Sequence, residues 1–205
     1  LKKIIPKGHK VLWITGYRLI MTAKGSFRLA IEEACKNTAG LRIRLLFVPM
    51  WSDTYKRVYD DDVSRCYSNV FYTLCRCIKK YGADIEIRIT DKPVFNDTYK
   101  VDGRIITGPY LHCTDSRNRR LITAKDFFSL DITDSNKELY HLMEADYISV
   151  WEQSSEYFDN KKLLDLFDSH DKYDKIMNMP SDERIRLIRG CIVSDSNKST
   201  TLTYS

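Results

Sequence analysis

The sequence lacks any hydrophobic run long enough to cross a membrane. No window approaches ~18 consecutive apolar residues, and no positively charged start is followed by an apolar stretch, as in a signal peptide. Its 6 cysteines form no Cys-x-x-Cys pair, and no histidine stands at metal-ligand spacing beside them. Buried free thiols in a reducing compartment explain them best, so we expect a cytoplasmic protein with neither disulfides nor a zinc site.

Several signatures of catalytic and cofactor sites are also missing. There is no phosphate-binding glycine loop and no Gly-x-Ser-x-Gly elbow, and the single Thr15-Gly16 pair is not a dinucleotide fingerprint. Asp60, Asp61 and Asp62 are compatible with metal ligation, but they also stand at the start of a predicted helix, where acidic residues complement the helix dipole. We favour this structural role and expect no cofactor.

The chain does contain enough apolar sequence for one substantial core. Its 205 residues are 43% hydrophobic and 12% aromatic, as in a folded globular protein. The net charge of +5 is modest, and acidic and basic residues are mixed along most of the chain. The exceptions are basic clusters at residues 2–10 and 117–120, for which a solvated loop and a phosphate or nucleic-acid site are alternative interpretations.

Hydrophobic periodicity predicts an α/β sandwich with a mixed sheet. Nearly continuous apolar stretches at 11–15 and 41–48 predict buried strands. Residues 83–89 alternate between apolar and charged side chains, as in a half-exposed or edge strand. Three- and four-residue steps predict a helix from 26 to about 37 and one long helix over 55–81.

The region after residue 94 predicts antiparallel pairing. Two strands, at 95–101 and 104–107, are joined through Asp102-Gly103, a dipeptide suited to a type I′ hairpin turn. A short strand at 127–132 and a helix opened by Ser135 follow, with Leu142 among the apolar residues assigned to the buried face of that helix. A Rossmann-like or TIR-like domain is the alternative fold, but it needs more parallel strand–helix units than this region supplies.

These elements divide the chain into four parts. Because the chain begins with Leu1 rather than methionine, we expect a segment upstream of it. Two short helices are predicted at 161–167 and 182–189. The expected parts are a linker at 1–10, the α/β domain at 11–158, a helical extension at 159–193 and a polar, disordered tail at 194–205.

Residues 11–158 resemble the phospholipase D-like domain of bacterial multidomain proteins. The resemblance rests on the order of five pieces: the strand ending at Gly16, the Arg-Ile-Arg-Leu-Leu-x-Val-Pro strand, the long helix, the isoleucine-rich strand and the Val-Asp-Gly-Arg-Ile-Ile-Thr-Gly-Pro-Tyr hairpin. An aromatic helix ending in Val150-Trp151-Glu152 completes it. The resemblance implies a phospholipase D-like mixed-sheet sandwich that forms a two-fold homodimer across its cleft.

The same resemblance implies that catalysis is lost. Active members carry His-x-Lys, four residues, Asp, six residues and Gly-Ser; the histidine attacks phosphorus and the lysine holds the phosphate oxygens. With Asp102 at the aspartate of this motif and Gly108 near its glycine, the histidine position falls on Phe95 and the lysine position on Asp97. A phenyl ring is no nucleophile and a carboxylate repels phosphate, so we expect no phosphodiesterase chemistry from this motif.

The cleft of such a domain is formed by the loops that follow its central strands, here 15–24, 50–54 and 110–120. These loops combine aromatic rings for stacking with basic side chains for phosphate, which suits a nucleotide or a nucleic-acid strand. The alternative is that the aromatic rings cap the sheet and the arginines are solvated. The candidate ligand-binding residues are Tyr17, Arg18, Lys24, Trp51, Tyr110, His112, Arg117, Arg119 and Arg120.

Three functions are compatible with this pattern. The first is a non-catalytic sensor or interaction module that binds a phosphorylated ligand or a protein partner and regulates an attached domain. The second is a phosphodiesterase or nuclease with a divergent active site, in which His112 is the nucleophile although no lysine stands at the required spacing. The third, a dimerisation scaffold, is compatible with the first. We favour the sensor or interaction module.

Overall fold

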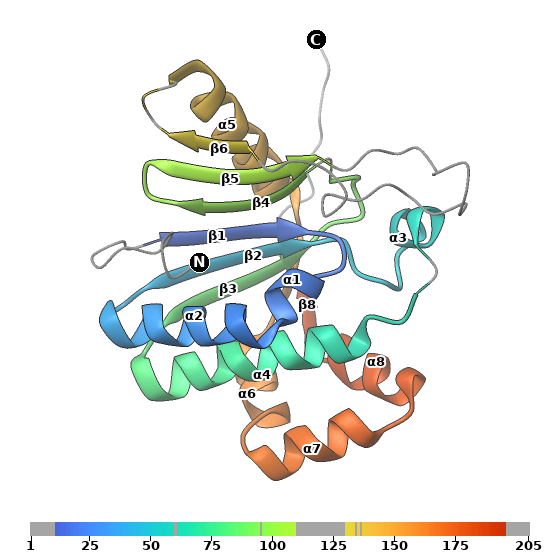
Figure 1. Cartoon of the computed structure of the whole chain (residues 1–205). Helices are drawn as coiled ribbons and strands as arrows, with labels where there is room; N and C mark the ends of the chain where they lie inside the picture. Colours follow the sequence, from blue (N-terminus) through green and yellow to red (C-terminus); the bar gives the residue numbers. More distant parts are fainter. Residues whose placement is uncertain are drawn as a thin grey trace.

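The computed structural model describes residues 11–59, 61–94, 96–109, 130–133, 135 and 137–195. Its strands form one eight-stranded sheet in the order β6-β5-β4-β1-β2-β3-β7-β8 (Figure 1). The strands are β1 Val11–Gly16, β2 Arg42–Phe47, β3 Asp84–Ile89, β4 Asn96–Val101, β5 Arg104–Pro109, β6 Leu130–Thr133, β7 Glu156–Phe158 and β8 Ile192–Ser194. The helices are α1 Ile20–Ala23, α2 Gly25–Asn37, α3 Asp53–Val58, α4 Ser64–Tyr81, α5 Lys137–Gln153, α6 Asn160–Leu166, α7 His170–Asn178 and α8 Ser181–Arg189.

The centre of the sheet is parallel because helices connect its strands. β1, β2 and β3 run in the same direction, with Ile14 opposite Leu45 and Leu45 opposite Ile87. Parallel neighbours need a crossover connection, and α2 and α4 supply it. The outer strands β4, β5, β6, β7 and β8 are all antiparallel to their neighbours. The predicted mixed α/β sheet is therefore confirmed.

Helices cover both faces of the sheet. α2 and α4 lie on one face and α5 lies on the other, while α6, α7 and α8 lie beyond α4 (Figure 1). The alternation of β1 explains this layering: Leu12 and Ile14 belong to the main core under α2 and α4, whereas Trp13 packs against α5. Because β1 is buried on both faces, its sequence is almost continuously apolar.

The single helix predicted over 55–81 is wrong, since the region forms two helices, α3 and α4, and the described residues between them, 59 and 61–63, are not helical. Acidic side chains stabilise the break. The Asp62 carboxylate accepts hydrogen bonds from the Ser64 N–H at 2.8 Å and from the Ser64 hydroxyl at 2.5 Å. The Asp61 carboxylate accepts one from the Tyr55 hydroxyl at 2.9 Å. Both therefore have structural roles at the helix ends, and Asp60 lies outside the described residues.

The predicted hairpin is present, but its turn is of another type. β4 and β5 pair up to Val101 and Arg104, which leaves Asp102 and Gly103 as a two-residue loop. Gly103 has a φ of 69°, whereas Asp102 is not among the residues with positive φ. A type I′ turn requires positive φ at both central positions, so the predicted turn type is wrong.

The C-terminal helices pack on α4. On α7 the Tyr173 ring stacks on Tyr72 of α4 with ring centroids 4.2 Å apart, and β8 pairs with β7 so that 192–194 joins the sheet. Helix α7 has no counterpart in the sequence prediction. No helix in the described ranges is long and apolar enough to span a membrane. The expected linker at 1–10 and residues 196–205 of the expected tail lie outside the described residues.

Candidate functional site

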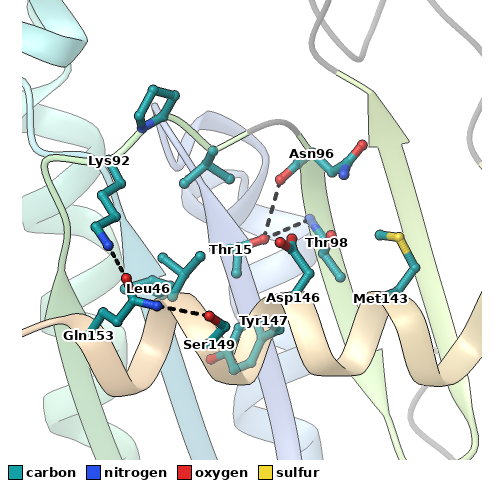
Figure 2. A pocket seen from close by; sticks show the side chains of 13 residues that line it. Thr15, Leu46, Lys92, Asn96, Thr98, Met143, Asp146, Tyr147, Ser149 and Gln153 are labelled. Atoms are coloured by element: carbon teal, nitrogen blue, oxygen red, sulfur yellow. Dashed lines mark hydrogen bonds between the residues drawn. The ribbon is translucent and has the colours of Figure 1, made fainter. Parts of the chain in front are cut away.

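A cavity of about 320 Å³ lies between the sheet and α5, where β1 and β2 end and the antiparallel β4 begins. The carboxyl edge of parallel strands is a common place for ligand sites in α/β proteins, and this volume is in the usual range for small-molecule pockets. Figure 2 shows side chains from strands of the sheet behind and from α5 in front converging on it. The lining residues are Thr15, Leu46, Lys92, Pro93, Val94, Asn96, Thr98, Met143, Asp146, Tyr147, Ser149, Val150 and Gln153.

Threonine hydroxyls make the floor of the cavity. The Thr15 hydroxyl donates to the Asn96 carbonyl at 3.3 Å and accepts from the Thr98 N–H at 3.1 Å. Thr15 and Thr98 form the last β1–β4 register pair, so this hydroxyl continues the hydrogen bonding where the ladder stops. The Thr98 hydroxyl is within 3.0 Å of the Thr107 hydroxyl on β5. All three side chains are buried, and the floor is held by groups that already bond one another.

An aromatic stack fixes the position of α5 over this floor. The Tyr147 ring stacks on Trp13 of β1 with centroids 4.4 Å apart and on Trp151 at 5.9 Å. The guanidinium of Arg88 lies 4.7 Å from the Trp151 ring centre and donates to the Trp151 carbonyl at 3.0 Å. Burial raises the pKa of the Tyr147 phenol well above its usual value, so this ring is a neutral wall and not an acid or base at neutral pH.

The rim of the cavity carries one cation and one anion on different elements. Lys92, in the loop after β3, donates from Nζ to the Gln153 side-chain oxygen, and the Gln153 amide donates to the Ser149 hydroxyl at 2.9 Å. An ammonium has three donors, so two remain for a ligand. Asp146 projects from α5 toward Thr15 and Asn96 (Figure 2). The cavity therefore offers a positive group at one end and acceptors at the other.

The structure describes four of the nine candidate ligand-binding residues, and two of these, Tyr17 and Arg18, both contact the Tyr59 ring. Tyr17 is buried, and its hydroxyl accepts from the Val94 N–H at 3.0 Å. Arg18 pairs with Asp61 at 2.5 Å and lies over the Tyr59 ring at 4.8 Å. These contacts place Arg18 on the α4 side of the sheet edge with a carboxylate already bound. Through Val94, Tyr17 nevertheless positions a residue that lines the cavity.

The remaining candidates have other surroundings. Lys24 is exposed just before α2, where it makes no side-chain capping bond. Trp51 is half-buried, packed edge-on against Tyr67 at 6.2 Å with the Arg189 guanidinium 5.7 Å from its ring centre. None of the four described candidates lines the cavity. The other five, namely Tyr110, His112, Arg117, Arg119 and Arg120, lie outside the described residues.

Sequence reasoning missed the residues that do line the cavity. The residues Asn96 and Thr98 stand two apart on β4 and so share a face, and Asp146, Ser149 and Gln153 recur at helical steps on α5. This polar spacing was the available signal, but nothing in the sequence pairs the strand with the helix. The assignment of Leu142 to the buried face is wrong, because its side chain is 66% exposed.

Two residues to which the resemblance gave catalytic positions are Phe95 and Asp97. Asp97 is paired with Gly108 across the β4–β5 hairpin, and Phe95 lies outside the described residues. Asn96 and Thr98, the neighbours of Asp97 on β4, line the cavity on the α5 side, so strand alternation places the Asp97 side chain on the α4 side of the sheet. The described residues contain no group of three or more His, Cys, Asp or Glu that could hold a metal ion.

No protein-family model and no curated protein matches this chain. The function must therefore be argued from the cavity and its chemistry.

Proposed function

We propose that this chain is a non-catalytic, phospholipase D-like binding module whose cavity takes a phosphorylated small molecule, and that binding regulates an attached domain. The observation that carries the proposal is the cavity itself. It has a lysine ammonium on its rim and a hydroxyl-bearing floor, but none of its described lining residues is a histidine or a cysteine. Such a site has groups to bind a phosphate and lacks the histidine nucleophile that phospholipase D-like cleavage uses.

The architecture supports the phospholipase D-like part of the proposal. The mixed sheet, the helices on both faces and the β4–β5 hairpin at Asp102-Gly103 agree with what the resemblance implies. Asp97 lies on β4, and the resemblance assigns it the position where that family requires a cation. A carboxylate there opposes phosphate binding at the motif, so the proposal assigns ligand binding to the α5 side of the same sheet edge.

Lys92 is the residue expected to hold the phosphate. It is exposed, its loop is held by the Tyr17–Val94 hydrogen bond, and a lysine ammonium is a compact charge suited to phosphate oxygens. Gln153, which accepts from Lys92, also donates to the Ser149 hydroxyl, so this hydroxyl belongs to the Lys92 end of the cavity. Phosphate oxygens would accept hydrogen bonds from the two ammonium donors of Lys92 that Gln153 does not use, while the Lys92–Gln153 bond keeps the loop after β3 attached to α5.

Thermal unfolding of the full chain with phosphorylated compounds tests the proposal. The probes are inorganic phosphate, ribose 5-phosphate and the nucleoside 5′-monophosphates at constant ionic strength. A ligand at 100-fold excess over its Kd stabilises by about 2.7 kcal/mol, which raises Tm by ~5–11 °C for a chain of this size.

The Lys92→Met variant is expected to lose this ligand-induced shift, and Lys161→Met is the control because Lys161 is exposed on α6, away from the cavity. If no phosphorylated probe shifts the Tm of the unmodified chain, or if Lys92→Met shifts as much as the control, the proposal is wrong.

A further inference from the structure

The end of the cavity opposite Lys92 has polar groups without partners. The Asp146 carboxylate and the Asn96 side-chain amide both line the cavity, and neither side chain has a hydrogen bond or ion pair within the described part of the chain. An ionised carboxylate only accepts hydrogen bonds, whereas an amide both donates and accepts. Asp146 is exposed and Asn96 is half-buried, and a ligand that binds directly to them would present donors to Asp146 and a donor or an acceptor to Asn96.

The distance between the two ends limits the ligand further. Asp146 and Gln153, the residue that holds Lys92, are seven positions apart on α5, which corresponds to about 10 Å along the helix. Figure 2 shows the same separation of roles, with Lys92 and Gln153 at one end and Asp146 and Asn96 at the other. In a pentose phosphate the hydroxyls are only a few bonds from the phosphate. The base edge of a nucleotide lies a whole sugar ring further away and matches the span better.

Apolar side chains form part of the cavity wall. Leu46, Val94 and Val150 are among the lining residues, and Leu46 is 1% exposed. Such walls suit the flat face of a nucleobase. Span, apolar wall and donor requirement all favour the same class of ligand.

We propose that the cavity binds a guanosine 5′-monophosphate-like nucleotide, with the base edge at Asp146 and Asn96 and the phosphate at Lys92. This inference rests on the proposed function and adds the identity of the base. Guanine alone among the common bases presents two adjacent N–H donors, from N1 and the 2-amino group, to which one carboxylate accepts in parallel. The guanine carbonyl at position 6 then meets the Asn96 amide. Adenine and cytosine place a single amino group beside a ring acceptor, which a carboxylate opposes.

Calorimetric titration of the full chain with GMP, AMP, IMP and ribose 5-phosphate tests this assignment. GMP is expected to bind at least ~10-fold more tightly than AMP or IMP, since a charge-assisted hydrogen bond of ordinary strength corresponds to about that factor. Asp146→Asn should weaken GMP about 10-fold or more and leave ribose 5-phosphate unchanged. The control Glu138→Gln removes a carboxylate from the exposed start of the same helix, outside the cavity lining, and should change neither.

A complementary ligand separates recognition from a structural effect. Xanthosine monophosphate has a carbonyl where GMP has its 2-amino group, and Asp146→Asn introduces an amide that can donate to it. The variant is therefore expected to prefer xanthosine monophosphate over GMP. If phosphorylated probes bind through Lys92 but the unmodified chain shows no preference for GMP, or Asp146→Asn keeps that preference, the base assignment is overturned while the proposed function stands. If no phosphorylated probe binds, both are overturned.

Discussion

The substitution Arg184→Ala is the most direct test of how the C-terminal helices are attached to the sheet domain. The Arg184 side chain is 2% exposed and comes from α8. Its Nε donates to the Ile176 carbonyl at 3.0 Å, and its Nη1 donates to the Ser64 hydroxyl at 2.6 Å. Nη2 donates to the carbonyls of Met177 and Met179 at 3.2 and 2.5 Å. One guanidinium thus joins α8, the end of α7 and the start of α4.

The expected loss in the free energy of unfolding follows from these contacts. Truncation leaves the buried acceptors without a donor and removes the cation that faces the Asp62 carboxylate. Breaking a buried charged network in this way costs about 3–5 kcal/mol, a large part of the ~5–15 kcal/mol that stabilises a typical domain. In a chain of about this length that loss lowers Tm by ~6–20 °C. Arg184→Lys keeps the charge but not the planar fork of donors, so its loss should be intermediate.

Urea unfolding of the full chain, followed by far-ultraviolet circular dichroism, measures the effect. Arg186→Ala is the matched control, because Arg186 is two residues away on the same helix and exposed. Hydrogen exchange should show that amides of α7 and α8 lose protection first in Arg184→Ala. If Arg184→Ala unfolds within ~0.5 kcal/mol of the Arg186→Ala control, which is the usual range for surface substitutions, the reasoning about this buried guanidinium is refuted.

Two further predictions concern local contacts. The Lys100 hydrogen bond lowers the pKa of Glu144 below its ordinary value and ties α5 to β4. This stabilisation is present above the ordinary glutamate pKa and is lost as pH falls through the lowered pKa of Glu144. In urea unfolding, Glu144→Gln should therefore destabilise the protein at pH 7 and have little effect near pH 3. Equal losses at both pH values would contradict this reasoning. Gly82 caps α4 with a φ of 62°, and a Cβ there meets nothing within 4 Å. Gly82→Ala should therefore lower the free energy of unfolding by about 1–2 kcal/mol through backbone strain alone. In the control Gly25→Ala the added Cβ also meets nothing within 4 Å, and no loss of stability is expected. Equal stabilities of the two variants would exclude that strain.

The layout of the fold was accessible from the sequence because it depends on local patterns. The apolar stretches of β1 and β2 indicate burial on both faces, and the strict alternation in β3 indicates burial on one. The dipeptide Asp102-Gly103 indicates a reversal between two strands. The break between α3 and α4 was missed because the side chains of Asp61 and Asp62 stabilise it, and helical periodicity carries no record of such bonds.

The candidate site was decided by tertiary structure. Thr15, Lys92, Thr98 and Asp146 come from four separate stretches of the chain and meet only because β4 pairs with β1 and α5 packs over both. The sequence did not show which face of α5 is buried, because the helix has apolar residues on its exposed side as well, including Leu142. Periodicity reports which side chains prefer burial, whereas the partner of a polar group is fixed by the packing of distant elements. For this reason the sequence by itself determined the central strands and helices α2, α5, α6 and α8, whereas only the packed structure determined β7, β8, α7, the cavity and the buried Arg184.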